Sequence, residues 1–142
     1  MVGLSACPYI PIYKFVSQTK SHDLVKYSGL QITPLDLFYG SRKGVATCSV
    51  GLRLNNQGDS SQTVIFSNSH LINLADTLKM QKIWSLGVSF ETDHVFILPS
   101  KKDTVLGFYF KDLKKNFGDT VKFVLEMQGI ENAIFIYKKV RS

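Results

Sequence analysis

The sequence predicts a mainly β fold: an antiparallel β-sandwich or a partly open β-barrel with one or two short helices. Five stretches in the second half of the chain alternate apolar and polar residues, as strands with one buried and one solvated face do. Hydrophobic residues make up 44% of the 142 residues, which is sufficient for a core. No repeat or linker divides the chain, so we expect a single domain over residues 1–142.

The N-terminal half mixes irregular and regular structure. Residues 1 to about 30 are expected to be irregular or extended, because Pro8 and Pro11 oppose helix. Residues 33–40 are predicted to form a short helix, because a threonine cap precedes Pro34 at the first helical position and a glycine follows. Residues 45–54 are predicted to form a strand with Cys48 on its apolar face.

The second half is predicted to be mostly strand. Residues 69–82 are the exception, because Leu71, Leu74 and Leu78 have the spacing of an apolar helix face. The clearest strand pattern covers residues 84–91, and it predicts burial of alternate residues. Those expected to be buried are Trp84, Leu86, Val88 and Phe90. Further strands are predicted at 63–66, 94–98, 104–111, 121–127 and 133–140.

Candidate catalytic and metal-ligating residues are scattered. The chain has three isolated histidines, and neither Cys7 nor Cys48 has a second cysteine at metal-ligand spacing. The cluster at residues 91–94 is expected to be a solvated turn between strands. Phosphate-binding loops and the nucleophile-elbow motif are missing from the sequence. We therefore expect a non-enzymatic protein without a cofactor or metal, in which Cys48 is a buried structural thiol.

The sequence also gives an expectation for location. Met1 to Ile10 lacks the basic start of a secretory signal, and no apolar run is long enough to span a membrane. Two cysteines are too few for a disulfide framework, so reduced thiols are expected. These features predict an intracellular protein, with a virion-associated one as a variant of that expectation.

Basic clusters are the strongest functional signal. The formal net charge is +6, and lysines greatly outnumber arginines. Such a balance suits contact with phosphate, whereas the scarcity of arginine disfavours base-specific reading. A solvated rim of lysines is the alternative interpretation. The candidate nucleic-acid or anion-binding residues are Lys101, Lys102, Lys111, Lys114, Lys115, Lys138, Lys139, Arg141, Arg42, Lys43, Tyr109 and Tyr137.

The expected function is a basic β-rich module that binds nucleic acid through its backbone phosphates, without sequence specificity, with the two tyrosines as stacking residues. The alternative is a self-assembling structural protein with a basic face against an anionic membrane. In size, lysine content and β character, the chain is broadly similar to small virus-encoded structural proteins such as matrix proteins. That resemblance implies a homo-oligomer.

Overall fold

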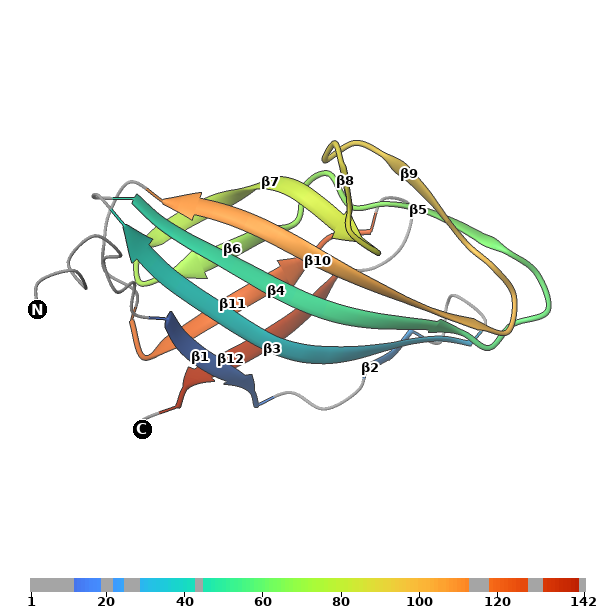
Figure 1. Ribbon diagram of the computed structural model, residues 1–142. Coiled ribbons are helices and arrows are strands. Elements are labelled where there is room, and N and C mark those ends of the chain that lie inside the picture. The colour runs from blue at the N-terminus through green and yellow to red at the C-terminus, as the bar shows by residue number, and fades with distance from the viewer. Residues whose placement is uncertain are drawn as a thin grey trace, which may run out of the picture.

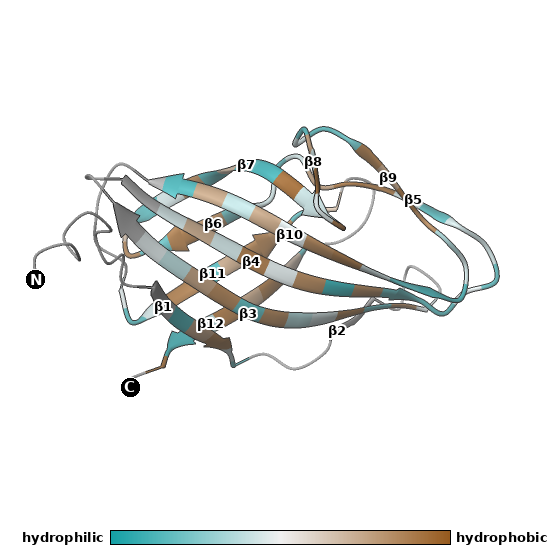
Figure 2. Ribbon diagram, viewed as in Figure 1, coloured by the Kyte–Doolittle hydropathy of each residue, from teal (hydrophilic) through white to brown (hydrophobic). Residues whose placement is uncertain are grey.

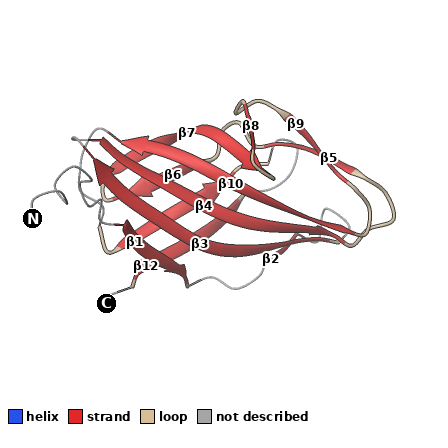
Figure 3. Cartoon of the chain, viewed as in Figure 1, coloured by secondary structure: helices blue, strands red, loops and turns tan. Residues whose placement is uncertain are grey.

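A computed structural model describes residues 12–18, 22–24, 29–42, 45–112, 118–127 and 132–140. These residues form strands, turns and loops, and Figure 3 shows no helix among them. The strands are β1 (Ile12–Ser17), β2 (His22–Leu24), β3 (Leu30–Arg42), β4 (Val45–Asn56), β5 (Gln62–Ile65), β6 (His70–Asn73), β7 (Asp76–Ser85), β8 (Val88–Phe90), β9 (Val95–Leu98), β10 (Lys102–Asp112), β11 (Thr120–Leu125) and β12 (Ala133–Lys139).

Eight of these strands form a closed antiparallel barrel, in the order β1-β12-β11-β6-β7-β10-β4-β3. β1 closes the barrel because it pairs with β12 on one side and with β3 on the other. β2 pairs with the beginning of β3, and β8 pairs with the end of β7 (Figure 1). The mainly β prediction is confirmed, and the architecture is a closed barrel.

Side chains fill the barrel interior. Apolar and polar residues alternate along β3, β4 and β10 (Figure 2), so that each strand turns one face inward. Phe123 is fully buried, and its ring centroid lies 5.2 Å from that of Phe108 and 5.7 Å from that of Phe110. The largest fully buried side chains are Tyr137, Phe15, Phe66, Phe108, Phe110, Phe123, Phe135, Leu30, Ile32, Leu37 and Leu52.

A two-stranded ribbon of β5 and β9 packs beside the barrel. Phe66 follows β5, and its ring lies 5.8 Å from Phe96 and 5.5 Å from Phe108, so it joins the ribbon to the core. The buried amide of Asn56 fixes the loop that leads into β5. Its Nδ2 donates to the carbonyls of Ser60 and Leu98, and its Oδ1 accepts from the amide of Gly58.

The helix predicted over 33–40 is wrong, because these residues lie within β3. The ladder to β4 shifts register between Pro34 and Leu37. Proline has no N–H to donate, so a bulge is where a strand tolerates it. The bulge also moves the buried positions from Leu30 and Ile32 to Leu37 and Tyr39, which hides the period of two.

The helix predicted over 69–82 is also wrong, because these residues form the β6–β7 hairpin. Leu74 is an exposed turn residue with a φ of 57°, rather than part of an apolar helix face. A register shift in the β7–β10 ladder leaves Gln81 between two paired positions. Leu78, Met80 and Ile83 are therefore all buried, despite the change from even to odd numbers.

The strand predicted over 84–91 is a hairpin of the end of β7, a two-residue turn and β8. Leu86 and Gly87 form the turn, and both have positive φ. Trp84, Leu86 and Val88 are exposed, and only Phe90 packs partly against the core. The sequence pattern predicts a buried Val88, which would make a charge there strongly destabilising. Because Val88 is exposed, we expect a charged side chain at this position to be compatible with folding.

Candidate functional site

Among the described residues, Cys48 and Tyr137 are the titratable side chains inside the barrel whose pKa values are clearly perturbed. Burial raises the pKa of the Cys48 thiol well above its usual range, so Cys48 is a poor nucleophile. Burial, reinforced by Cys48 and Asp36, likewise raises the pKa of Tyr137. The structure confirms the predicted burial of Cys48.

Tyr137 requires a correction. It is expected to be an exposed stacking residue, but it is fully buried. Its side chain lies on the inner face of β12, as do those of Ala133 and Phe135. The Tyr137 hydroxyl is buried without a hydrogen-bond partner among the described residues. It therefore cannot stack on a base.

The predicted lysines of β10 lie at opposite ends of the barrel. Lys111 is level with Thr47 and Gly40, beside the β3–β4 turn, whereas Lys102 pairs with Asn56 at the other end of β4. The two lysines are nine steps apart along the strand, which is roughly 30 Å. Lys101 has a structural role at the far end. Its Nζ donates to the carbonyl of Gln57 at 2.6 Å and lies 3.4 Å from Asp59.

The other predicted residues are partly outside the structure. Lys138 is exposed at the end of β12, and Lys139 is half-buried. Arg42 ends β3 and pairs with Val45 through its backbone. Outside the described residues lie Lys43, Lys114, Lys115 and Arg141.

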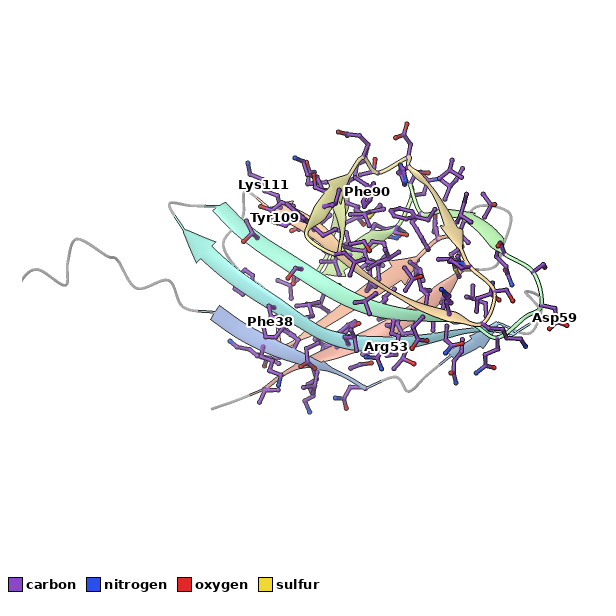
Figure 4. All side chains as sticks on the ribbon, turned by 45° about the vertical axis from the view of Figure 1, so that its right-hand side comes forward. Phe38, Arg53, Asp59, Phe90, Tyr109 and Lys111 are labelled. Atoms are coloured by element: carbon purple, nitrogen blue, oxygen red, sulfur yellow. The ribbon has the colours of Figure 1, made fainter. Side chains whose placement is uncertain are left out.

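Three exposed lysines surround Tyr109 on the outer wall. Lys82 of β7 pairs directly with Tyr109 of β10. Lys79 and Lys111 lie just beyond the next pair, Met80 and Phe110, on the same two strands. Figure 4 shows Tyr109 and Lys111 projecting near the end of β10. We call Lys79, Lys82, Tyr109 and Lys111 the basic face.

The basic face carries uncompensated charge. Within the described ranges, ion pairs join Lys14 to Asp36 at 3.3 Å and Lys101 to Asp59, but none involves the lysines of the basic face. Like charges on neighbouring strands repel each other, so an arriving anion would relieve this repulsion. Sequence reasoning missed Lys79 and Lys82 because it placed them in a helix.

The described residues contain no group of three metal-ligating side chains. In the cluster at residues 91–94, the carbonyl of Glu91 accepts from the amide of His94. The His94 ring lies 4.5 Å from the Phe90 ring and 4.7 Å from the Phe96 ring. This imidazole therefore has an aromatic packing role.

Comparison with known proteins gives one fold likeness. No family model and no curated protein matches the chain. A crystal structure of YcdA from Bacillus subtilis, described as a "putative lipoprotein", matches with a TM-score of 0.56 and 11% identity. The alignment covers 85% of this chain and 39% of YcdA, so the chain spans well under half of that protein. This likeness shows a shared fold.

None of the described residues forms a helix that is long and apolar enough to cross a membrane.

Proposed function

We propose that the protein is a non-catalytic binding module held at a membrane surface, attached by a lipid on Cys7 and oriented by the basic face. The observation that carries the proposal is the segment Leu4-Ser5-Ala6-Cys7. Small residues directly before a cleavage position are typical of export signals, and we take the cysteine that follows them here as the residue that would carry a lipid. The fold likeness to YcdA, a protein described as a "putative lipoprotein", supports this interpretation. It departs from the intracellular location expected above.

The chemistry of attachment is a thioether. The sulfur of Cys7 forms a bond to the glyceryl carbon of a phospholipid, the carbon–oxygen bond to the phosphate headgroup breaks, and the thiol proton is released. Cys48 cannot take this role, because it is buried in the barrel. Each methylene of the lipid that enters the bilayer contributes about 0.8 kcal/mol to membrane binding.

The position of β1 supports an orientation of the barrel. Ile12 of β1 pairs with Gly40, Gly40 with Thr47, and Thr47 with Lys111, so β1 begins level with the basic face. Four residues lie between Cys7 and Ile12, so their Cα atoms are five steps apart, at most about 18 Å of extended chain. A lipid on Cys7 would therefore hold this end of the barrel near the bilayer.

The basic face would then meet anionic headgroups. A lysine near such a surface contributes about 1 kcal/mol to binding. The glyceryl group transferred to Cys7 carries two acyl chains, which are sufficient for stable anchoring, so the basic face would orient the barrel rather than hold it at the membrane. The two features would thus act together.

Metabolic labelling with an alkyne-bearing palmitate tests the anchor. With the gene expressed from its own locus, we expect labelled protein in the membrane fraction and loss of both the label and the membrane association in Cys7→Ser. Cys48→Ala is the matched control and should keep the label. An unlabelled parent, or a labelled Cys7→Ser variant, would contradict the proposal.

Vesicle sedimentation of the unlipidated chain tests the basic face separately. Lys111→Glu should weaken binding to vesicles of phosphatidylglycerol and phosphatidylcholine by about fivefold or more. Lys102→Glu makes the same charge change on the same strand at the opposite end, and it should bind as the parent does. Equal effects of the two variants would exclude a specific role for this face.

Nucleic acid remains a second candidate partner, because Tyr109 lies opposite Lys82 and two residues before Lys111. Such an arrangement can stack a base beside its phosphates. A single-stranded oligonucleotide held by three lysines should show a log–log salt slope of roughly −2. Tyr109→Leu should weaken oligonucleotide binding and leave vesicle binding unchanged. A parent that binds only vesicles rules out this candidate.

A further inference from the structure

The β7–β8 hairpin, which lies beside β10 (Figure 1), ends in a turn with an apolar tip. Leu86 is 98% exposed, the highest value among the exposed large hydrophobic residues of the described chain. Val88 after the turn and Trp84 before it are about half exposed. No charged residue lies between Ile83 and Phe90. The hairpin thus presents apolar side chains to solvent without a charge among them.

The turn holds a leucine where its backbone disfavours one. The φ of Leu86 is 50°, a left-handed conformation that asparagine or glycine adopts with less strain. Leu74 also has a positive φ, but its side chain packs against Gly118, where an added Cβ would come within 2.8 Å of it. A Cβ on Gly87 would meet nothing within 4 Å, so the tip around Leu86 has no such packing. The Leu86 side chain therefore gains stability only when a partner removes it from water.

The apolar surface continues from the hairpin onto β10. Trp84 pairs with Gly107, and the hydroxyl of Ser85 donates to the carbonyl of Val105 at 3.2 Å. The same register places Leu86 level with Val105, which is itself exposed on the outer wall. The glycine beside Trp84 adds no polar group to this surface. We call Trp84, Leu86, Val88 and Val105 the apolar patch.

Positive charges border the apolar patch on two sides. Lys82 of the basic face lies two residues before the tryptophan, and the exposed Arg53 pairs with Val105 across β4 and β10. Two carboxylates are close in the chain: Glu91 follows β8, and Asp103 accepts a hydrogen bond from a neighbouring asparagine. Neither of them forms an ion pair with Lys82 or Arg53 in the described part of the chain. With the other lysines of the basic face, the cations around the patch outnumber these carboxylates, which favours an anionic partner.

We propose that the apolar patch inserts into the interfacial layer of an anionic bilayer, with the outer wall of β7 and β10 against the membrane. Tryptophan favours the headgroup level, and leucine and valine gain stability at the boundary with the acyl chains. Lys82 and Arg53 would then contact lipid phosphates at the rim of the patch.

Other partners fit these features less well. A nucleic acid would neutralise the cations but would leave Leu86 in water. A second copy of the chain, related by a two-fold axis, would bring Lys82 and Arg53 of each molecule towards those of the other, and like charges across an interface repel. The inference rests on the proposed membrane attachment, and it adds the element that would reach below the headgroups.

Trp84 is the sole tryptophan of the chain, so its fluorescence reports directly on the apolar patch. The probes are vesicles of phosphatidylglycerol and phosphatidylcholine, with and without bromine on the acyl chains, added to the unlipidated protein. We expect a blue shift of the emission on binding and quenching by the brominated lipids. Leu86→Asn should weaken vesicle binding by about fivefold or more, because the apolar side chain at the tip is lost. This variant should remain folded, because asparagine suits the turn.

Ile134→Asn is the matched control. Ile134 is an exposed apolar residue of β12, the strand opposite β10 in the closed order of eight, so this variant should bind vesicles as the parent does.

The outcomes separate insertion from the proposed function. Vesicle binding without a change in Trp84 emission, or equal binding by Leu86→Asn and the parent, would overturn insertion and leave the basic face, which Lys111→Glu tests, in place. A parent that binds no vesicles would overturn both, whereas palmitate labelling tests the anchor on Cys7 independently. A dimer seen by light scattering and lost in Leu86→Asn would assign the apolar patch to a second copy instead.

Discussion

Tyr137 shows how one buried polar atom can lower stability. Its hydroxyl has no partner among the described residues, although the ring fills the barrel. Leaving a buried hydroxyl unsatisfied costs about 1–3 kcal/mol. Tyr137→Phe should therefore increase the free energy of unfolding by about 1 kcal/mol, as measured by urea denaturation. Tyr109→Phe, on the outer wall, should be neutral, and a loss of stability in Tyr137→Phe would show that its hydroxyl is bonded.

Cys48 makes stability depend on pH on the alkaline side. An unfolded thiol releases its proton above about pH 8.5, whereas burial keeps the Cys48 pKa higher in the folded state. The unfolded state therefore gains stability as pH rises, and the free energy of unfolding falls by up to about 1.4 kcal/mol per pH unit. Denaturation between pH 8.5 and 10 should show a shallower decline for Cys48→Ala than for the parent. If the free energy of unfolding fell equally with pH in Cys48→Ala and in the parent, the Cys48 thiol would not be the cause of the pH dependence.

Sequence reasoning succeeded where a residue's strand was placed correctly. Cys48 lies in an uninterrupted run of β4. The period of two places it on the same apolar face as Val50, and this correctly predicted that its side chain points inward. The same period of two, counted from Phe135, places Tyr137 in the interior. The prediction that Tyr137 stacks on a base did not take this periodicity into account. Lys101 could not be understood from the sequence, because its partners Gln57 and Asp59 belong to a distant loop.

At the scale of elements, bulges explain the failed predictions. The irregularity after Pro34 and the extra residue at Gln81 each shift the buried positions by one. A strand with such a shift has apolar residues at mixed spacings, which imitate a helix face. The exposed turn at Leu74 adds a further apolar residue at helical spacing. Only pairing with neighbouring strands resolves this ambiguity, and pairing is a tertiary property.

The β7–β8 turn is a site for stabilisation. Leu86 is 98% exposed and has a φ of 50°, a left-handed conformation that costs a residue such as leucine about 1–2 kcal/mol. Asparagine followed by glycine is the preferred pair when both turn residues have positive φ. Leu86→Asn should raise the melting temperature by roughly 2–4 °C. Leu86→Ala is the control, and an equal rise in that variant would mean that the gain is not conformational.

At the scale of the whole molecule, charge was easier to predict than its arrangement. Net charge and lysine content indicated an anion-binding surface, but its members depend on which strands are neighbours. Lys79 and Lys82 join Lys111 only because β7 lies beside β10.

Closure of the barrel depends on β1, and Phe15 is the residue that tests it. Phe15 is fully buried, and its backbone pairs with Lys139 on β12 and Leu37 on β3. Phe15→Ala should cost about 3–5 kcal/mol through the lost contacts and the cavity, a large share of a typical 5–15 kcal/mol stability. Loosening β1 would also expose the edges of β3 and β12, so light scattering should show aggregation on mild heating.

Phe38→Ala provides the comparison for Phe15→Ala, because it removes the same side chain from the outer face of the adjoining strand. Lys14, the neighbour of Phe15, pairs with Phe38, so the two phenylalanines are nearly level. Phe38 is half exposed, and its loss should lower the free energy of unfolding by less than about 1 kcal/mol without aggregation. Equal decreases in the free energy of unfolding of Phe15→Ala and Phe38→Ala would mean that β1 does not close a common core. We expect the large loss in Phe15→Ala alone, and because a barrel has no edge from which to unravel, the unfolding of the eight strands should follow one transition when it is monitored by fluorescence and by circular dichroism.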